Sequence, residues 1–138
     1  MEVSLNNKIR LKGNCVYPGK VEAEALVAPK YLQGFTNCNP TKGYTTERNH
    51  PLFKVPYTGK VLVFYSPRGS GGFMVYGFGA KPAAFVHTKH SPLTAGCALV
   101  ARVPAMTGFE DDPLKYIETG DMVLVNADEG YIEITKKV

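Results

Sequence analysis

The sequence has few cysteines, no long apolar run and little excess charge. None of its apolar stretches approaches the length of a membrane span, and residues 1–13 lack the apolar segment of a secretory signal. We therefore expect a cytoplasmic protein that does not contact a membrane.

The three cysteines, Cys15, Cys38 and Cys97, are widely spaced and form no Cys-x-x-Cys pair. His87 and His90 are too sparse to make a metal site without another cluster nearby. The simplest interpretation is that the thiols are buried or incidental. The chain alone is therefore expected to bind no metal, and any iron–sulfur cluster must take its ligands from another chain.

A length of 138 residues, with 44% hydrophobic and 20% charged residues, fits one globular domain. The net charge of +4 is mild, and basic residues are scattered among acidic ones. No basic face for nucleic acid is predicted. The mild positive charge suits an anionic metabolite or an acidic partner, and composition does not choose between them.

The chain is organised around residues 59–87. Residues 60–65 form an apolar, β-branched and aromatic run that predicts a buried strand. A Gly-rich loop follows, then an apolar segment at 73–78 that we expect to be a short helix. Residues 82–87 predict a second strand.

The loop places a cation, a hydroxyl and three glycines together, as Arg68, Gly69, Ser70, Gly71 and Gly72. Such a loop can bring backbone N–H groups and the start of a helix against a carboxylate or phosphate. Composition alone favours an ordinary tight connection, since the loop lacks the spacing of a nucleotide-binding fingerprint.

Near the start, residues 8–12 and 20–27 alternate in polarity and predict two strands, joined through a bend at 17–19. We expect these strands to pair antiparallel. Glu22 and Glu24 fall on one strand face, where a solvated surface is a simpler interpretation than a pair of catalytic carboxylates.

Residues 29–56 show no lasting helical or strand period, and a connection this long is unusual unless it covers or binds something. An exposed surface loop and a ligand-facing loop are equally consistent with it. The polar side chains that could face a ligand are Asn37, Asn39, Thr41, Arg48 and His50.

The second half predicts more mixed structure. Ser91-Pro92 resembles a helix N-cap followed by proline, opening a helix through residue 101. Residues 103–106 predict a short strand. Residues 107–120 contain an acidic run and predict a solvated loop. Residues 122–125 and 131–135 predict a closing hairpin.

Several separated motifs, in this order, resemble the small, swivelling-domain subunit of the aconitase X family of hydro-lyases. This family includes phosphomevalonate dehydratase and cis-3-hydroxy-L-proline dehydratase. The motifs are YPGKVEAEALV (17–27), NPTKGYTTERNHPL (39–52), GKVLVFYSPRGS (59–70), KPAAFV (81–86), SPLTAGCALVA (91–101) and ETGDMVLVNADEGYIEI (118–134).

The resemblance implies an α+β fold, with residues 1–138 forming a single swivelling β/β/α domain of barrel-like sheets and short helices. It implies a large-subunit partner, in a heterodimer or larger assembly, that carries the iron–sulfur cluster. Ser70 corresponds to the family's proposed proton acceptor, and the surrounding loop helps to enclose a small anionic hydroxy acid, with (R)-5-phosphomevalonate as one candidate. We infer separately that Arg68 clamps an anionic substrate group.

Two departures from the family pattern lie beside the presumed substrate. Gly71-Gly72-Phe73 replaces small and hydroxyl residues, and Ser91-Pro92 replaces Asp-Pro. A second hypothesis is therefore a non-catalytic swivelling domain that binds a partner or an anionic ligand.

Overall fold

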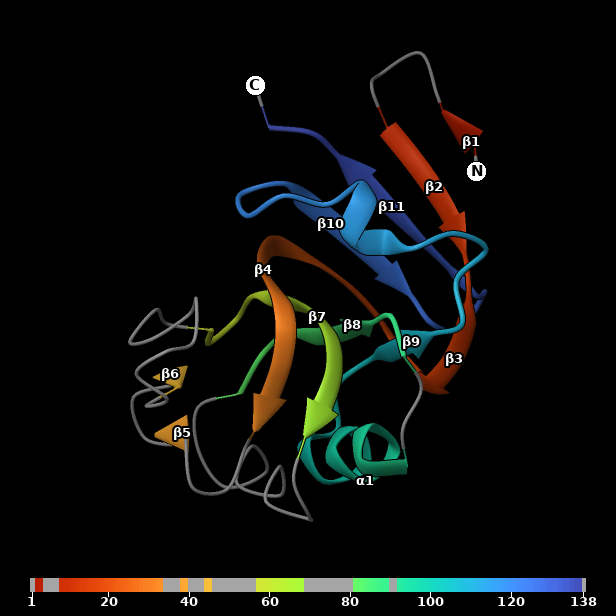
Figure 1. The fold of residues 1–138 in the computed structure, drawn as a ribbon. Coiled ribbons are helices and arrows are strands. Elements are labelled where there is room, and N and C mark those ends of the chain that lie inside the picture. The colour runs from red at the N-terminus through yellow and green to blue at the C-terminus, as the bar shows by residue number, and fades with distance from the viewer. Residues whose placement is uncertain are drawn as a thin grey trace.

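Figure 1 shows the computed structural model, which describes residues 2–3, 8–33, 38–39, 44–45, 57–68, 81–89 and 92–137. Within these ranges the chain is built mainly of strands. They are β1 (Glu2–Val3), β2 (Lys8–Lys12), β3 (Asn14–Tyr17), β4 (Lys20–Gln33), β5 (Cys38–Asn39), β6 (Tyr44–Thr45), β7 (Val61–Arg68), β8 (Ala84–His87), β9 (Ala105–Thr107), β10 (Met122–Asn126) and β11 (Tyr131–Thr135). The helices are α1 (Pro92–Ala101) and the short 3-10 helix η2 (Pro113–Lys115).

Most strands join one sheet in the order β1-β2-β11-β10-β4-β7-β8-β9-β3, while β5 pairs with β6. Strand β4 connects two halves of this sheet. Its first residues pair antiparallel with β10, and its later residues pair parallel with β7. Strands β7, β8 and β9 continue in parallel.

The sheet curls until its two ends meet. Strands β2 and β3 lie near opposite ends of the strand order, yet only Gly13 separates them along the chain. The amide of Gly13 donates to the carbonyl of Gly130 at 3.0 Å, which holds this crossing point against the β10–β11 hairpin. The predicted barrel-like arrangement is confirmed.

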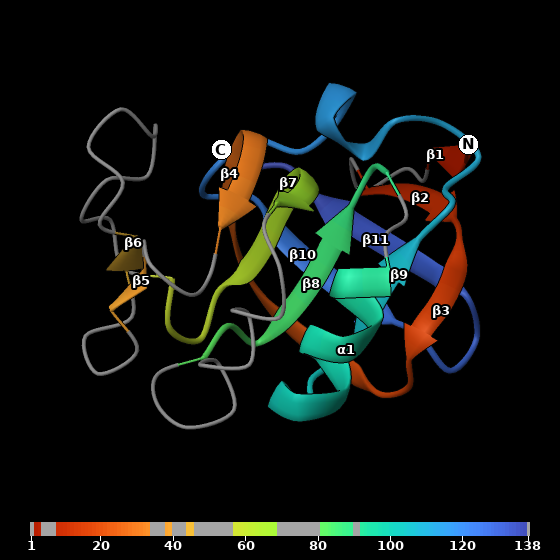
Figure 2. The same cartoon turned by 60° about the horizontal axis from the view of Figure 1, so that its bottom comes forward.

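Side chains of β7 alternate between two hydrophobic cores. Leu62 and Phe64 enter a core that also contains Ala98 and Ala101 of α1, whereas Val61 and Val63 enter the core beneath β2, β10 and β11. Helix α1 lies over β8 and β9 in Figure 2. The result is three layers, β/β/α, with β7 buried on both faces as its unbroken apolar run predicts.

Local sequence patterns located most elements correctly. The strands at 8–12 and 60–65, the helix at 92–101 and the closing hairpin are confirmed, with small shifts at their ends. The strand predicted at 82–87 begins at Ala84, and that predicted at 103–106 is β9. Ser91 and the helix expected at 73–78 lie outside the described residues.

The predicted antiparallel pairing of residues 8–12 with 20–27 is wrong. Strands β11 and β10 lie between β2 and β4. Strand β11 pairs antiparallel with β2, and β10 pairs antiparallel with β4. Strand β3, which the sequence did not predict, follows β2 along the chain and pairs with β9. The C-terminal hairpin therefore lies between β2 and β4, which were expected to pair directly with each other.

The absence of regular structure predicted for residues 29–56 is also wrong in part. Strand β4 runs on to Gln33, with an irregularity between Ala28 and Tyr31. Pro29 and the broken alternation hide this extension in the sequence, whereas pairing with β7 supports it. Residues 34–37, 40–43 and 46–56, which include Asn37, Thr41, Arg48 and His50, lie outside the described residues, and Asn39 pairs with Tyr44 in the β5–β6 hairpin.

The buried carboxylate of Asp121 holds the segment that follows β11 by hydrogen bonds to Lys136 and Lys137. Asp121 is fully buried and accepts hydrogen bonds from the Lys136 ammonium and from the backbone amides of Glu118 and Lys137. Burial raises the pKa of this carboxyl, but these hydrogen bonds outweigh it, so the pKa of Asp121 lies below its usual value.

Candidate active site

Strand β7 extends beyond its neighbour β8. Residues Val61 to Phe64 pair with β8, whose last residue, His87, lies opposite Phe64. Beyond this point β7 continues for residues 65–68, about 13 Å, along β4, and the Tyr65 carbonyl accepts a hydrogen bond from the Lys89 amide at 2.8 Å. Pro67 has no backbone N–H to donate, and it lies past the last residue of β8, where a strand tolerates a missing donor.

Arg68 ends β7, in register with Gln33 at the end of β4. Both positions lie at the carboxyl edge of the parallel strands, the edge where open α/β sheets commonly bind ligands. The side chain of Arg68 and all of Gly69, Ser70, Gly71 and Gly72 lie outside the described residues. The placement of Arg68 in the loop is wrong, because the predicted strand continues through Arg68, and the functional roles of these five residues stay predictions.

A buried histidine ends the neighbouring strand. His87 has no exposed surface, and its ring stacks on that of Phe64 with 5.6 Å between ring centroids. Its carbonyl accepts a hydrogen bond from the Thr107 hydroxyl at 3.0 Å, which connects the ends of β8 and β9. The prediction that His87 ends a strand is confirmed, and His90 lies outside the described residues.

The acidic turn before η2 is hydrogen-bonded to the residue that follows β8. The Asp112 carboxylate accepts from the Thr88 hydroxyl at 2.9 Å and from the Leu114 amide at 3.0 Å, where it caps η2. Thr88 directly follows β8, and η2 contacts β7. The sequence patterns did not predict this connection, although Asp112-Pro113 carries the same signal of an N-cap followed by proline as Ser91-Pro92.

The solvated loop predicted for residues 107–120 is therefore only partly correct. Glu110 is exposed, whereas Asp111 and Asp112 are half-buried and organise the turn. A hydrogen bond from the Tyr116 hydroxyl, followed by those from the Asp112 amide and Lys115, lowers the pKa of the Asp111 carboxyl. The same contact raises the pKa of Tyr116.

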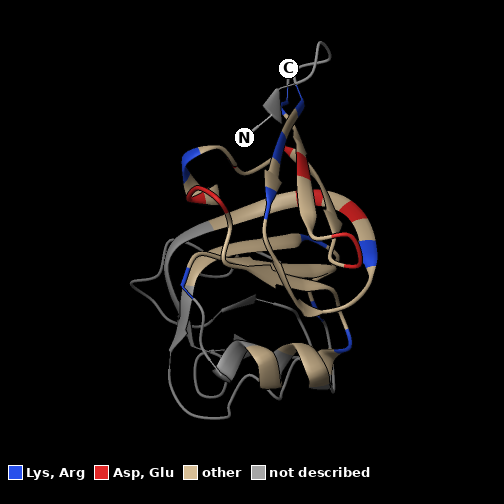
Figure 3. Cartoon of the chain, turned by 90° about the vertical axis from the view of Figure 1, so that its right-hand side faces the viewer, with Lys and Arg blue, Asp and Glu red and all other residues tan. Residues whose placement is uncertain are grey.

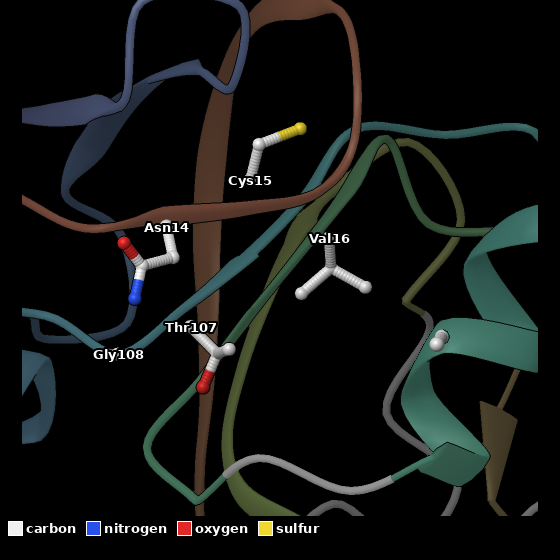
Figure 4. Close-up of a pocket in the computed structure, with 6 residues that line it drawn as sticks. Asn14, Cys15, Val16, Thr107 and Gly108 are labelled. Atoms are coloured by element: carbon white, nitrogen blue, oxygen red, sulfur yellow. The ribbon is translucent and has the colours of Figure 1, made fainter.

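A cavity of about 390 Å³ lies between β3, the end of β9 and α1 (Figure 4). Its lining residues are Asn14, Cys15, Val16, Ala95, Thr107 and Gly108. Figure 4 shows the sulfur of Cys15 on the opposite side of β3 from the Val16 side chain. Cys15 is exposed, so of the two expected alternatives it is not a buried thiol, and partial desolvation and the charge of Asp128 raise its pKa.

The remaining charged candidates behave as surface residues. Glu22 and Glu24 are exposed, and Glu24 forms an ion pair with Lys60 at 3.3 Å, so the solvated-face interpretation is confirmed. In the described part of the chain, no three His, Cys, Asp or Glu side chains gather as a metal-binding group. Among the described helices, none is long and apolar enough to span a membrane.

These layers, with β4, β7, β8 and β9 paired in parallel, define a swivel-type β/β/α domain. The aconitase X swivel domain family matches residues 10–134, and the chain belongs to this family. The resemblance inferred from the separated motifs is confirmed.

Curated relatives and a solved structure agree with this assignment. The phosphomevalonate dehydratase small subunit of Methanosarcina mazei is 34% identical over 134 residues, covering 94% of this chain and 93% of the relative. The protein of the same description from Methanosarcina acetivorans is 33% identical, covering 93% and 92%. The crystal structure of Thermococcus kodakaraensis aconitase X in its holo-form aligns with a TM-score of 0.83 and 28% identity, covering 93% of this chain and 99% of that one.

Proposed function

We propose that this chain is the small subunit of an aconitase X-type hydro-lyase and works with a separate large subunit. The observation that carries the proposal is that relatives matching more than nine-tenths of both chains are named phosphomevalonate dehydratase small subunits. In this proposal residues 1–138 act as a single swivelling domain that completes an active site on the partner.

The substrate is a small anionic hydroxy acid, and (R)-5-phosphomevalonate is the first candidate. The relatives' names support this choice. The net charge of +4 suits an anionic ligand. A hydroxyproline-type substrate also carries a carboxylate, so both substrate classes belong in the test.

Dehydration removes a proton from one carbon and a hydroxyl from its neighbour. Ser70 takes the carbon-bound proton in this proposal. Two residues of chain span at most about 7 Å, which keeps Ser70 close to the end of β7, where Arg68 lies. A serine is a poor base unaided, so its alkoxide requires stabilisation by nearby N–H groups or a cation.

The rest of the loop supplies that stabilisation. Gly69, Gly71 and Gly72 have no Cβ to keep an anion away from backbone N–H groups. Arg68 has a planar guanidinium that can hold a carboxylate or phosphate through two parallel hydrogen bonds. We assign these four residues to substrate binding and Ser70 to catalysis.

We assign the iron–sulfur cluster to the large subunit. The residues described in this chain offer no group of metal ligands to hold it. When bound, a cluster with an open iron position supplies a Lewis acid for the leaving hydroxyl. The contribution of this chain is then the base and the anion-binding loop.

The test is co-expression with the large subunit, anaerobic purification, and a dehydration assay on phosphomevalonate and cis-3-hydroxy-L-proline. Turnover by the complex, and by neither chain alone, is the expected result. A stable, cluster-loaded complex that dehydrates neither compound would contradict the proposed substrates. Failure to form any complex would favour the non-catalytic domain.

A further inference from the structure

Helix α1 has a buried face and an exposed face. Ala98 and Ala101 are 0% and 1% exposed and pack into the core with Phe64 of β7. Ala95, Gly96 and Leu99 are exposed, and Leu99 reaches 64% exposure. The helix therefore places aliphatic side chains both in the hydrophobic core and, at Leu99, on the exposed surface.

The composition of α1 is unusual for a helix on a protein surface. Its ten residues, PLTAGCALVA, include no charged side chain. A surface helix normally places charged or polar residues on the face that leaves the core, and a helix that is apolar all round is normally covered. Leu99 and Met122 are the large hydrophobic side chains exposed among the described residues, and Leu99 is the more exposed.

The cavity lies beside this exposed face. Ala95 of α1 and Val16 of β3 give it apolar walls, while Asn14 and Thr107 add polar groups. Together, the exposed residues Ala95, Gly96 and Leu99 and this cavity form what we call the α1 face. An apolar projection beside a hollow is typical of an interface core that receives a side chain from a partner.

Most of the charged residues that the structure describes lie away from α1, although Arg102 directly follows the helix and the Lys81 ammonium donates to the carbonyl of its last residue, Ala101. Figure 3 shows most of the Lys, Arg, Asp and Glu positions on the strands and turns at the top of the view, whereas α1, at the bottom, carries none where it is described. Depletion of charge is the compositional mark of interface cores. The opposite end of the molecule carries ion pairs such as Lys136 with Glu118 and Arg10 with Glu133.

We propose that the large subunit docks on the α1 face, and this inference rests on the proposed function. Helix α1 contacts β7, the strand that ends at Arg68. In Figure 1 the tips of β4 and β7 point toward the end of the molecule where α1 lies. A partner seated on α1 is therefore next to the edge where a shared active site requires it. The matching surface is an apolar patch with one protruding aliphatic or aromatic side chain that enters the cavity.

The test measures affinity of the purified large subunit for this chain under anaerobic conditions. Leu99→Lys places a charge on the exposed face and is expected to raise the Kd by roughly 30-fold, the size of an interface hot spot. Gly96→Gln is a second variant, because a Cβ at Gly96 meets no atom within 4 Å and the helix accommodates the side chain. It adds polar bulk to the α1 face and is expected to weaken binding as well.

Two controls separate docking from folding. Met122→Lys introduces the same charge at another exposed hydrophobic residue, 41% exposed on β10, and should leave the Kd unchanged. Leu99→Met keeps an apolar side chain and should retain tight binding. Circular dichroism and thermal melts of each isolated variant should match those of the unaltered chain.

Each outcome is informative. Leu99→Lys and Gly96→Gln chains that fold and bind as tightly as the unaltered chain would overturn the docking surface and leave the proposed function standing. Weakened binding by these variants, combined with a complex that dehydrates no candidate substrate, would overturn the function and leave the docking surface standing. An unaltered chain that binds no large subunit would overturn both.

Discussion

The imidazole of His87 lies nearly parallel to the ring of Phe64, with 16° between their planes and 5.6 Å between their centroids. The two residues are register partners on β8 and β7, and both are buried. Phe64 also meets Phe85 edge-on at 6.2 Å. This aromatic group supports the last paired position of β7 and β8, beyond which β7 continues along β4 to Arg68.

We expect His87→Ala to destabilise the chain by about 2–3 kcal/mol, because a buried ring is lost and a cavity is left against Phe64. His87→Phe keeps an aromatic ring and should cost less. Urea unfolding followed by circular dichroism measures both. A His87→Ala midpoint equal to that of the unaltered chain would show that the stack contributes nothing to stability.

Ser70→Ala is expected to reduce turnover by the assembled enzyme by about 100-fold or more, the usual range for loss of a catalytic base. Stability should not change. Ser91→Ala is the comparison variant, and it should chiefly weaken the predicted helix cap, by about 1 kcal/mol. Near-normal turnover by Ser70→Ala would remove Ser70 from the mechanism.

Arg68→Lys keeps the positive charge of Arg68 and loses its planar fork. If Arg68 holds a substrate carboxylate or phosphate, this change should raise KM by about 10-fold or more, with a smaller effect on kcat. Steady-state kinetics of the complex separate the two constants. An unchanged KM in Arg68→Lys and in Arg68→Ala would contradict the anion clamp.

Asp121→Asn should lower the free energy of unfolding at neutral pH by about 2–3 kcal/mol, because Lys136 loses its buried partner. The pKa of Asp121 is lowered in the folded state. Its stabilisation is therefore complete above the unfolded-state pKa of about 3.9 and is lost as the pH falls through the folded-state value.

Thermal melts from pH 7 down to pH 2 should accordingly show a shallower acid decline for Asp121→Asn than for the unaltered chain. Glu22→Gln, at an exposed strand position, serves as the control and should follow the unaltered curve. Parallel curves for Asp121→Asn and the unaltered chain would mean that this carboxylate does not govern acid stability.

Arg102→Gly should stabilise the chain. Arg102 follows α1 with a φ of 57°, a left-handed conformation that glycine adopts without a Cβ penalty, and its amide donates to the Ala98 carbonyl. We expect a gain of about 0.5–1 kcal/mol, or roughly 3 °C in Tm. Arg102→Ala retains a Cβ and should show no such gain, so equal melting temperatures for the two variants would contradict this explanation.

Short-range patterns were sufficient to predict several elements. The alternation in β2 and the apolar run of β7 indicate which side chains of these strands are buried. The proline after Ser91 indicates where α1 begins. The apolar run predicted the strand at 60–65, and the structure extends it to Arg68 beside β4. Separated motifs together predicted the family and its β/β/α fold, which the family match at residues 10–134 confirms.

The partners of each strand were decided only by tertiary structure. Backbone N–H and C=O groups are the same in every residue except proline, so alternation determines which face of a strand is buried and does not choose its neighbour. Strand β3 pairs with β9, the C-terminal hairpin separates β2 from β4, and β4 extends past Pro29 because β7 lies beside it. The exposure of Leu99 likewise depended on which face of an uncharged helix the core covered.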